Sequence, residues 1–247
     1  MKKIRLDTLL VERELVETRT KAQAVILAGL VFTGTRRLDK PGTQVDPAAE
    51  IEVRGRPHPW VSRGGVKLAH GLDHFNIDPA GLVCLDIGAS TGGFTDVLVS
   101  RGAARVTAVD VGHGQLDWKL RNDDRVTVLE RTNARHLTTE LVPDPSALVV
   151  CDASFIGLST VLPAALSLTA PAARLVALIK PQFEVGKSLV GKGGVVRDPA
   201  AREDACDKVA AWLEARPGWR VLGVTESPIT GPEGNVEYLI GALRDNA

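Results

Sequence analysis

Apolar and polar stretches alternate regularly along the chain from about residue 62. Short apolar runs typical of strands fall at 83–87, 106–109, 126–129, 148–151, 175–179, 221–225 and 238–242. The runs Leu148–Cys151 and Leu175–Ile179 are apolar throughout, as expected of parallel strands that are covered on both faces. Helical patterns at 63–75 and 94–100 lie on either side of the first run. This alternation predicts an α/β fold with a doubly wound, Rossmann-like sheet, mostly parallel, whose last strand is antiparallel.

The first 54 residues follow a different pattern. Two short helical patterns precede strand-like runs at Leu30–Thr33 and Glu50–Val53, which predicts a small α+β domain over residues 1–54. Residues 55–61 contain two prolines and one glycine, so a helix cannot continue through them and a linker is expected. The second domain is then expected over residues 62–247.

Charge is distributed unevenly over a chain whose formal net charge is zero. Residues 1–67 carry 13 Lys and Arg against 8 Asp and Glu, an excess of +5, and the remainder carries 17 against 22, an excess of −5. A basic N-terminal region followed by an acidic remainder favours an N-terminal module that binds a polyanion.

Cysteine usage and hydropathy favour a soluble cytoplasmic protein. Cys84, Cys151 and Cys206 are far apart and form no CxxC pair, so neither a zinc site nor a disulfide framework is indicated, and free thiols within strands are expected. The long apolar segment Leu158–Ile179 is interrupted by two prolines and Arg174. We therefore expect a buried helix, a turn and a core strand there, not a membrane span.

A glycine-rich turn follows the first apolar run of the second domain. The segment Asp86–Phe94 has a strand that ends in an acid, then a turn, then the start of a helix. Gly88 permits a tight turn, and Gly92 and Gly93 are expected to let the backbone approach a ligand closely. The next strand ends at Asp110, whose carboxylate could bind both ribose hydroxyls of a nucleoside.

Three interpretations of this turn compete. The dinucleotide pattern GxGxxG fails, because Ser90 stands at its second glycine. The nucleophile elbow GxSxG of serine hydrolases matches Gly88–Gly92, but only His113 and His136 follow, and neither lies late enough to complete a triad. A methyltransferase turn that binds S-adenosylmethionine is favoured.

Four charged residues fall near the expected ligand crevice. Asp152 and Lys180 each follow a buried strand, and Glu237 begins the last one, so an antiparallel last strand brings all three to one edge of the sheet. Lys67 lies on the helix before the first strand. A lysine at a buried strand end is costly unless it has partners or a function.

Several longer motifs resemble one known family. They are Ser62-Arg-Gly-Gly-Val-Lys-Leu68, Ala89-Ser-Thr-Gly-Gly-Phe-Thr95, Lys180-Pro-Gln-Phe-Glu-Val-Gly-Lys187 and Gly234-Asn-Val-Glu-Tyr238. In this order they resemble the TlyA family, whose members are named as haemolysins or as ribosomal RNA 2′-O-methyltransferases. The resemblance extends over nearly the whole chain.

The resemblance implies an RNA-binding front domain of the type named after the fourth small-subunit ribosomal protein. The matching positions are Arg19, Ala22, Ile26, Gly29, Val31, Gly34 and Pro41, while Thr18 and Thr33 replace the more usual Ser and Asn. Candidate phosphate contacts are Arg19, Lys21, Arg36, Arg37 and Lys40.

The second domain resembles the FtsJ/RrmJ ribose methyltransferases. Their Lys-Asp-Lys-Glu tetrad falls on Lys67, Asp152, Lys180 and Glu237. The implied contacts of S-adenosylmethionine are Asp86, Gly88, Ala89, Ser90, Thr91, Gly92, Gly93, Phe94, Asp110, Asn133, Ala134 and Asp152. The chain ends about ten residues after Glu237, like the shorter family members, which implies cytidine in large-subunit (23S) RNA as substrate, with small-subunit (16S) RNA as a second possibility.

The expected chemistry is an in-line methyl transfer to a ribose 2′-hydroxyl, which needs no metal. Lys180 is expected to contact the hydroxyl, either as a general base with a lowered pKa or as a stabiliser of the developing oxyanion. The alternatives are a membrane-active haemolysin, an RNA-binding assembly factor without catalysis, and a serine hydrolase that uses Ser90. The intact tetrad argues against an assembly factor.

Overall fold

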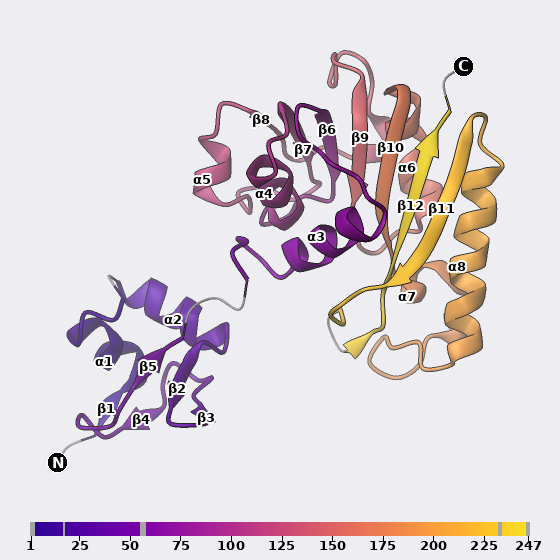
Figure 1. The fold of residues 1–247 in the computed structure, drawn as a ribbon. Helices are drawn as coiled ribbons and strands as arrows, with labels where there is room; N and C mark the ends of the chain where they lie inside the picture. Colours follow the sequence, from indigo (N-terminus) through magenta and orange to yellow (C-terminus); the bar gives the residue numbers. More distant parts are fainter. Residues whose placement is uncertain (1–2, 17, 55–57, 232–233, 246–247) are drawn as a thin grey trace. The chain divides into compact units, whose positions relative to one another are not determined.

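The computed structural model describes residues 3–16, 18–54, 58–231 and 234–245 (Figure 1). The chain forms two compact units, Met1–Pro59 and Trp60–Ala247. Residues 55–57 of the expected linker lie outside the described residues. Each unit is described by itself.

The first unit is a small α+β domain, as predicted. Its elements are β1 (Ile4–Arg5), α1 (Leu6–Glu12), α2 (Arg19–Leu27), β2 (Val31–Thr33), β3 (Arg36–Arg37), β4 (Gln44–Val45) and β5 (Glu52–Val53). The strands pair antiparallel in the orders β3-β2-β5 and β1-β4. Its core includes Leu6, Leu10, Ile26 and Val31, all fully buried. The two-residue strands β1, β3 and β4 were not predicted, because two residues are too few to show an alternation.

The second unit is built on a seven-stranded sheet in the order β11-β12-β10-β9-β6-β7-β8. The strands are β6 (Val83–Ile87), β7 (Arg105–Val109), β8 (Val126–Leu129), β9 (Ser146–Cys151), β10 (Thr169–Ile179), β11 (Trp219–Glu226) and β12 (Tyr238–Arg244). Neighbours from β10 to β8 pair parallel, whereas β12 runs antiparallel to both β10 and β11. The predicted doubly wound sheet with its antiparallel last strand is therefore confirmed.

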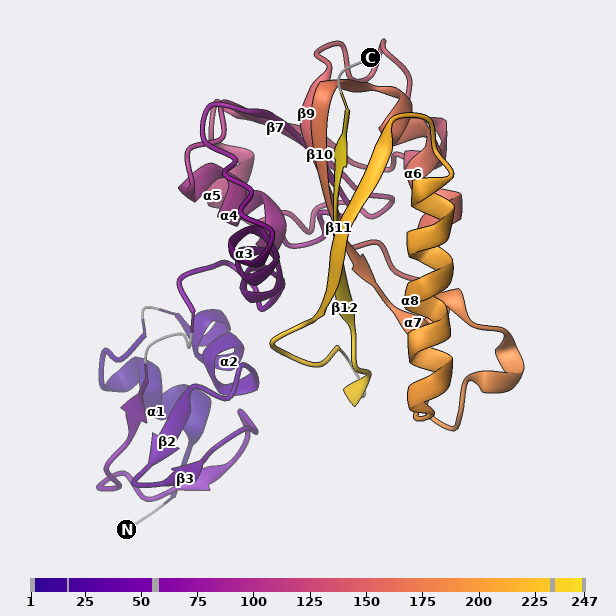
Figure 2. The ribbon, with the colours of Figure 1, turned by 45° about the vertical axis from the view of Figure 1, so that its right-hand side comes forward.

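Helices cover both faces of this sheet (Figure 2). They are α3 (Gly64–His74), α4 (Gly93–Ser100), α5 (Trp118–Arg121), α6 (Leu158–Ser167), α7 (Pro181–Glu184) and α8 (Pro199–Glu214), with 3₁₀ turns η1 (Ala134–His136) and η2 (Lys187–Leu189). Because side chains alternate along a strand, Cys84 of β6 belongs to the apolar cluster that includes residues of α3 and α4, while Leu85 belongs to the cluster that includes residues of α6 and α8.

The apolar segment 158–179 forms α6 and β10, as expected for a core helix followed by a core strand. Among the described residues, no helix is both long enough and apolar enough to cross a bilayer. The expectation that all three cysteines lie in strands was wrong for Cys206, which lies on α8. This 16-residue helix was not predicted from the sequence. Apolar residues of α8 such as Val209 and Leu213 are spaced at a helical period, which could have indicated it.

Gly241 of β12 allows the ring of Phe75 to pack on the sheet, and its replacement should destabilise the second unit. A Cβ atom at Gly241 would lie 2.5 Å from Phe75 Cγ. Gly241→Ala should cost about 1–3 kcal/mol, as for other overpacked cores, and lower the melting temperature by about 2–4 °C per kcal/mol. Gly186→Ala is the control, because the nearest atom to its Cβ is 3.9 Å away. Equal thermal melts for the two variants would contradict this packing.

Candidate active site

Two adjoining cavities open at the carboxyl ends of β6, β9 and β10. Their volumes are about 610 Å³ and 430 Å³. We call the larger the tetrad cavity, since Lys67, Asp152 and Lys180 line it, and the smaller the Asp110 cavity. Gly88, Ser90, Asp152 and Ser154 line both and form a shared wall. The site thus has two compartments that meet beside Asp152.

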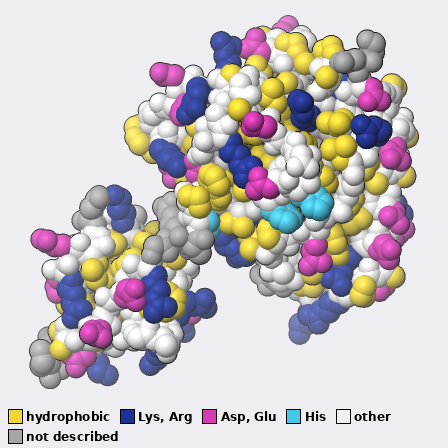
Figure 3. Space-filling view, in the orientation of Figure 1, with side chains coloured by type: hydrophobic (Ala, Val, Ile, Leu, Met, Phe, Trp, Pro, Cys, Tyr) yellow, Lys and Arg dark blue, Asp and Glu magenta, His cyan; other side chains and the backbone are white. Residues whose placement is uncertain are grey.

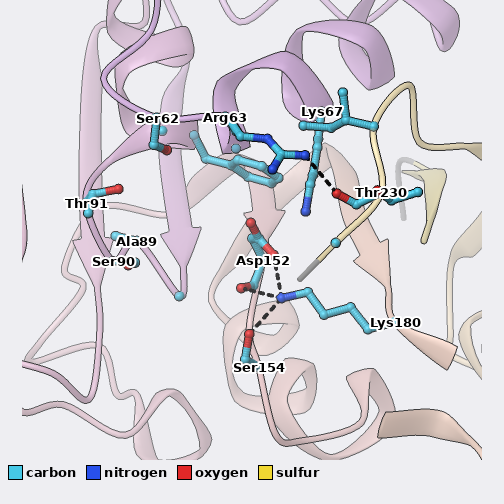
Figure 4. Close-up of a pocket in the computed structure, with 16 residues that line it drawn as sticks. Ser62, Arg63, Lys67, Ala89, Ser90, Thr91, Asp152, Ser154, Lys180 and Thr230 are labelled. Atoms are coloured by element: carbon cyan, nitrogen blue, oxygen red, sulfur yellow. Dashed lines mark hydrogen bonds and ion pairs between the residues drawn. The ribbon is translucent and has the colours of Figure 1, made fainter. Parts of the chain in front are cut away.

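The four predicted catalytic residues form two buried ion pairs. Lys180 Nζ lies 2.6 Å from Asp152 Oδ1 and donates to Ser154 Oγ at 2.8 Å (Figure 4). Lys67 Nζ lies 2.5 Å from Glu237 Oε2. Both lysine side chains are only 9% exposed, and that of Glu237 is fully buried. Lys67, Asp152 and Lys180 point into the same part of the tetrad cavity in Figure 4, whereas Glu237 does not line this cavity.

Sheet register explains how these residues meet. Ile179 of β10 pairs with Tyr238 of β12, so Lys180 and Glu237 occupy neighbouring ends of antiparallel strands. Asp152 follows β9 directly, and its backbone N–H donates to the carbonyl of Ile87 at 2.9 Å, which fixes it beside the Gly88 turn. Lys67 lies on α3, and both Lys67 and its neighbour Leu68 are buried. One edge of the sheet therefore collects all four side chains.

Asp86 lies beneath the turn and lines neither cavity. Its carboxyl is fully buried and accepts a hydrogen bond of 2.6 Å from Thr95 Oγ1, while Oδ1 has no hydrogen-bond partner among the described residues. Burial raises the pKa of Asp86 to about 7, against the opposing effect of the Thr95 hydrogen bond.

The glycines of the turn have different roles from one another. Gly88 has φ +83°, and a Cβ there would lie 2.9 Å from the backbone of Ala153, so a close approach of two strand ends requires glycine. Packing within the protein also favours glycine at Gly92 and Gly93, and the approach of a ligand to them stays a prediction. A Cβ at Gly92 would meet Leu120 Cδ1 at 2.3 Å, and one at Gly93 would meet Ser62 Oγ at 2.3 Å. These two glycines allow the protein to pack against itself, and only Gly93 lines a cavity.

Ser90 is held as part of the turn and has no neighbouring base. Its backbone N–H donates to Asp110 Oδ2 at 2.8 Å, and its hydroxyl donates to Gln115 Oε1 at 3.2 Å. Neither cavity is lined by a described histidine. His113 instead contacts Glu130, with Nδ1 2.9 Å from Oε2. The serine hydrolase interpretation therefore lacks its general base.

The Asp110 cavity combines a carboxylate with apolar surface. Asp110 and Asn133 line it together with Val111 and Ile156. The two Asp110 oxygens accept backbone hydrogen bonds from Ser90 and Gly112, which orients the carboxylate and leaves further lone pairs for a ligand. Ala134 also lines the cavity. The cavity therefore offers hydrogen-bond acceptors beside apolar surface, as a nucleoside requires.

Family comparisons agree with this architecture. The model of FtsJ-like methyltransferases matches residues 60–244, and that of the S4 domain matches residues 4–51. The chain belongs to the FtsJ-like methyltransferase family.

Whole-chain relatives add detail. A Mycobacterium tuberculosis protein named 16S/23S rRNA (cytidine-2′-O)-methyltransferase TlyA is 51% identical over 240 residues, 97% of this chain and 89% of the relative. A Campylobacter jejuni protein named 23S rRNA (cytidine-2′-O)-methyltransferase TlyA is 37% identical over 205 residues, 80% of this chain and 73% of the relative. A solved structure from Streptococcus thermophilus, provisionally named a haemolysin, is 40% identical with a TM-score of 0.77 and covers 100% of this chain and 90% of its own. The TlyA resemblance is confirmed.

Within this FtsJ-like methyltransferase, several cavity residues had not been singled out from the sequence. Arg63 lines the tetrad cavity, and its guanidinium donates to the carbonyl of Thr230 at 3.1 Å. Ser154 joins both cavities, and Phe155 lines the Asp110 cavity although its side chain is 89% exposed. The position of Ser154 two residues after a strand-end acid was an available signal. Thr230 belongs to an irregular loop whose path the sequence does not indicate.

The five basic residues expected to contact phosphate lie on the first unit, which we call the S4 unit after the domain that it matches, and all five are exposed. Arg19 Nε donates to Asp7 at 3.1 Å. In the part of the chain that the structure describes, Arg36, Arg37 and Lys40 have no ion-pair partner. Figure 3 shows dark-blue Lys and Arg side chains over the surface of this unit. Unpaired cations of this kind suit a polyanionic ligand.

Asp86→Asn should remove one contribution to the dependence of stability on pH. Between about pH 4 and pH 7 the folded state retains a proton on Asp86 that the unfolded state has lost, because the folded pKa is about 7 and the ordinary value is 3.8. Asp86 therefore contributes a loss of stability as pH rises through this window, by up to about 1.4 kcal/mol per pH unit, and the Asn variant should lack this contribution. Urea unfolding across the window measures both slopes. Asp204→Asn, on the exposed face of α8, should keep the wild-type slope. Parallel curves for Asp86→Asn and the wild type would refute a buried protonated Asp86.

Proposed function

We propose that this protein transfers a methyl group from S-adenosylmethionine to the ribose 2′-hydroxyl of a cytidine in ribosomal RNA. The observation that carries the proposal is the shared wall, which sets a nucleoside-sized cavity directly beside two buried lysine–carboxylate pairs. The cytidine-2′-O specificity of the TlyA relatives supports the choice of acceptor.

Residues of the Asp110 cavity would hold the adenosyl part of the cofactor. Asp110 would accept hydrogen bonds from the ribose hydroxyls, with Asn133 and Ala134 beside the base. The methionine part would pass along Gly88 and Asp152 toward the tetrad cavity. When bound, S-adenosylmethionine supplies an electrophilic methyl carbon, and its carbon–sulfur bond breaks as the new carbon–oxygen bond forms.

The residues of the tetrad cavity would prepare the acceptor. Lys180 Nζ would hold the 2′-oxygen and stabilise its developing negative charge, and the hydroxyl proton would leave through the Lys180–Asp152 pair to water. Lys67, kept in place by Glu237, would add a second positive charge at the same position. The alignment of hydroxyl and methyl then requires both cavities at once.

In this proposal, the S4 unit would hold part of the RNA. Arg19, Lys21, Arg36, Arg37 and Lys40 would contact phosphates, which positions a structured RNA without reading its bases. Large-subunit RNA is the proposed substrate, because the Mycobacterium tuberculosis and Campylobacter jejuni TlyA proteins are both named for 23S RNA, whereas 16S RNA is named for the former alone of these two.

Methyl transfer to separated ribosomal subunits tests the function directly. Tritium from labelled S-adenosylmethionine should enter 23S RNA at a single cytidine ribose. Lys180→Ala should reduce transfer by at least about 100-fold, the range for loss of a general acid–base group, and change cofactor affinity by no more than a few fold. Lys208→Ala removes an exposed lysine paired with Asp204 on α8 and should leave the rate unchanged. Binding to subunits without transfer would indicate an assembly factor, and near-normal turnover by Lys180→Ala would refute the assignment.

Removal of basic residues from the S4 unit should weaken RNA binding in a salt-dependent way. The double variant Arg36→Ala/Arg37→Ala should lower the slope of log affinity against log salt by about 1–2, because each lost phosphate contact releases one counterion fewer. Filter binding of large subunits at several salt concentrations measures this slope. Arg220→Ala, an exposed change on β11, is the matched control. An unchanged slope in the double variant would show that β3 does not contact phosphate.

A further inference from the structure

The segment between β9 and α6 forms part of both cavities. Asp152 and Ser154 line both, while Ala153, Phe155 and Ile156 line the Asp110 cavity. Phe155 has φ +66°, a left-handed conformation that is unfavourable for an aromatic residue. Such a conformation persists only where the surroundings determine it. Something outside this short segment must therefore hold it.

Glu184 provides a hydrogen bond at the end of the segment. Its Oε1 accepts from the backbone N–H of Leu158 at 2.8 Å, at the first turn of the 10-residue helix α6. Gly157 at the N-cap cannot supply this acceptor from its own side chain. A Cβ at Gly157 would lie only 2.9 Å from Glu184 Oε2, so glycine there leaves space for the carboxylate.

The short helix α7 joins Lys180, at its N-cap, to Glu184, its last residue. Pro181 opens α7, and the N–H groups of Phe183 and Val185 donate to the carbonyls of Lys180 and Pro181 at 2.8 Å and 3.0 Å. Lys180 Nζ contacts the beginning of the 152–158 segment through Ser154 and the Asp152 carbonyl. The Phe183 ring lies 5.2 Å from the Phe155 ring, centroid to centroid. The turn thus contacts the segment at its start, its middle and its end.

The charge of Glu184 is not compensated by an ion pair in the described part of the chain. Burial raises its pKa, and the hydrogen bond from Leu158 opposes that rise only in part. Glu184 is half-buried, and its carboxylate faces the N-terminus of α6, where an acceptor and a negative charge are both favourable. This geometry fits a residue that holds the start of α6 in place.

We infer that Glu184 is a positioning residue that fixes residues 153–158, and thereby keeps the wall of the Asp110 cavity in register with Lys180. This inference rests on the proposed function, in which that cavity holds the adenosyl cofactor. It assigns no chemical step to Glu184. The residue acts on methyl transfer only through the shape of the cofactor cavity.

Hydrogen exchange and cofactor binding test this role. In ligand-free Glu184→Ala, amides of residues 153–158 should exchange about tenfold faster, the change expected for a lost cap. The Kd of S-adenosylhomocysteine and the KM for S-adenosylmethionine should rise about tenfold as well, with kcat changed far less. Glu184→Gln keeps an oxygen acceptor and should stay within about twofold of wild type in all three measurements. Glu214→Ala, an exposed change at the end of α8, is the control.

Gly157→Ala gives a second approach, because its methyl group displaces the Glu184 carboxylate without removing it. This variant should show the same local increase in exchange. Wild-type exchange and affinity in Glu184→Ala would overturn the inference, as would a Gln variant that is as damaged as the Ala variant. Failure of the wild-type protein to bind S-adenosylhomocysteine would instead overturn the proposed function, and the ligand-free exchange rates would still decide the role of Glu184.

Discussion

Two ammonium groups at one buried sheet edge require two carboxylates. Lys67 and Lys180 are each about nine-tenths buried, and an unpaired buried charge of this kind would cost several kcal/mol. Asp152 comes from the end of a parallel strand, as is usual for α/β sheets. Glu237 reaches the same edge only because β12 runs antiparallel, so that the start of this strand lies where its neighbours end. The antiparallel direction of β12 is therefore the feature of the fold on which the two ion pairs depend.

The same edge also explains why the two cavities share a wall. Gly88 lets the turn after β6 pass so close to the backbone at Ala153 that an added Cβ would lie 2.9 Å from it, and Ser90 and Asp152 lie on the boundary between the cavities. Both cavities are lined by Asp152, the ion-pair partner of Lys180. Asp86 and Thr95 lie below this boundary and link β6 to α4 by a buried hydrogen bond.

Much of this architecture could be read from the sequence, because strand periodicity and strand-end residues obey strong rules. The unbroken apolar runs of β9 and β10 located Asp152 and Lys180, and the Gly88 turn with Asp110 located the Asp110 cavity. Contacts between residues distant in sequence could not be read in this way. The bond from Glu184 to Leu158, the packing of Gly92 on Leu120 and the contact of Arg63 with Thr230 depend on loop paths that no local pattern encodes. The helix α8 was missed for a different reason, since its small apolar residues give a weak periodic signal.

In the proposed function, cofactor and acceptor meet beside the shared wall of the two cavities. A crystal structure with S-adenosylhomocysteine bound tests this most directly. We predict that the ribose contacts Asp110, that the base lies beside Asn133, and that the thioether sulfur faces Lys180 Nζ. A ligand whose sulfur points away from Lys180, or one bound outside the Asp110 cavity, would contradict the account.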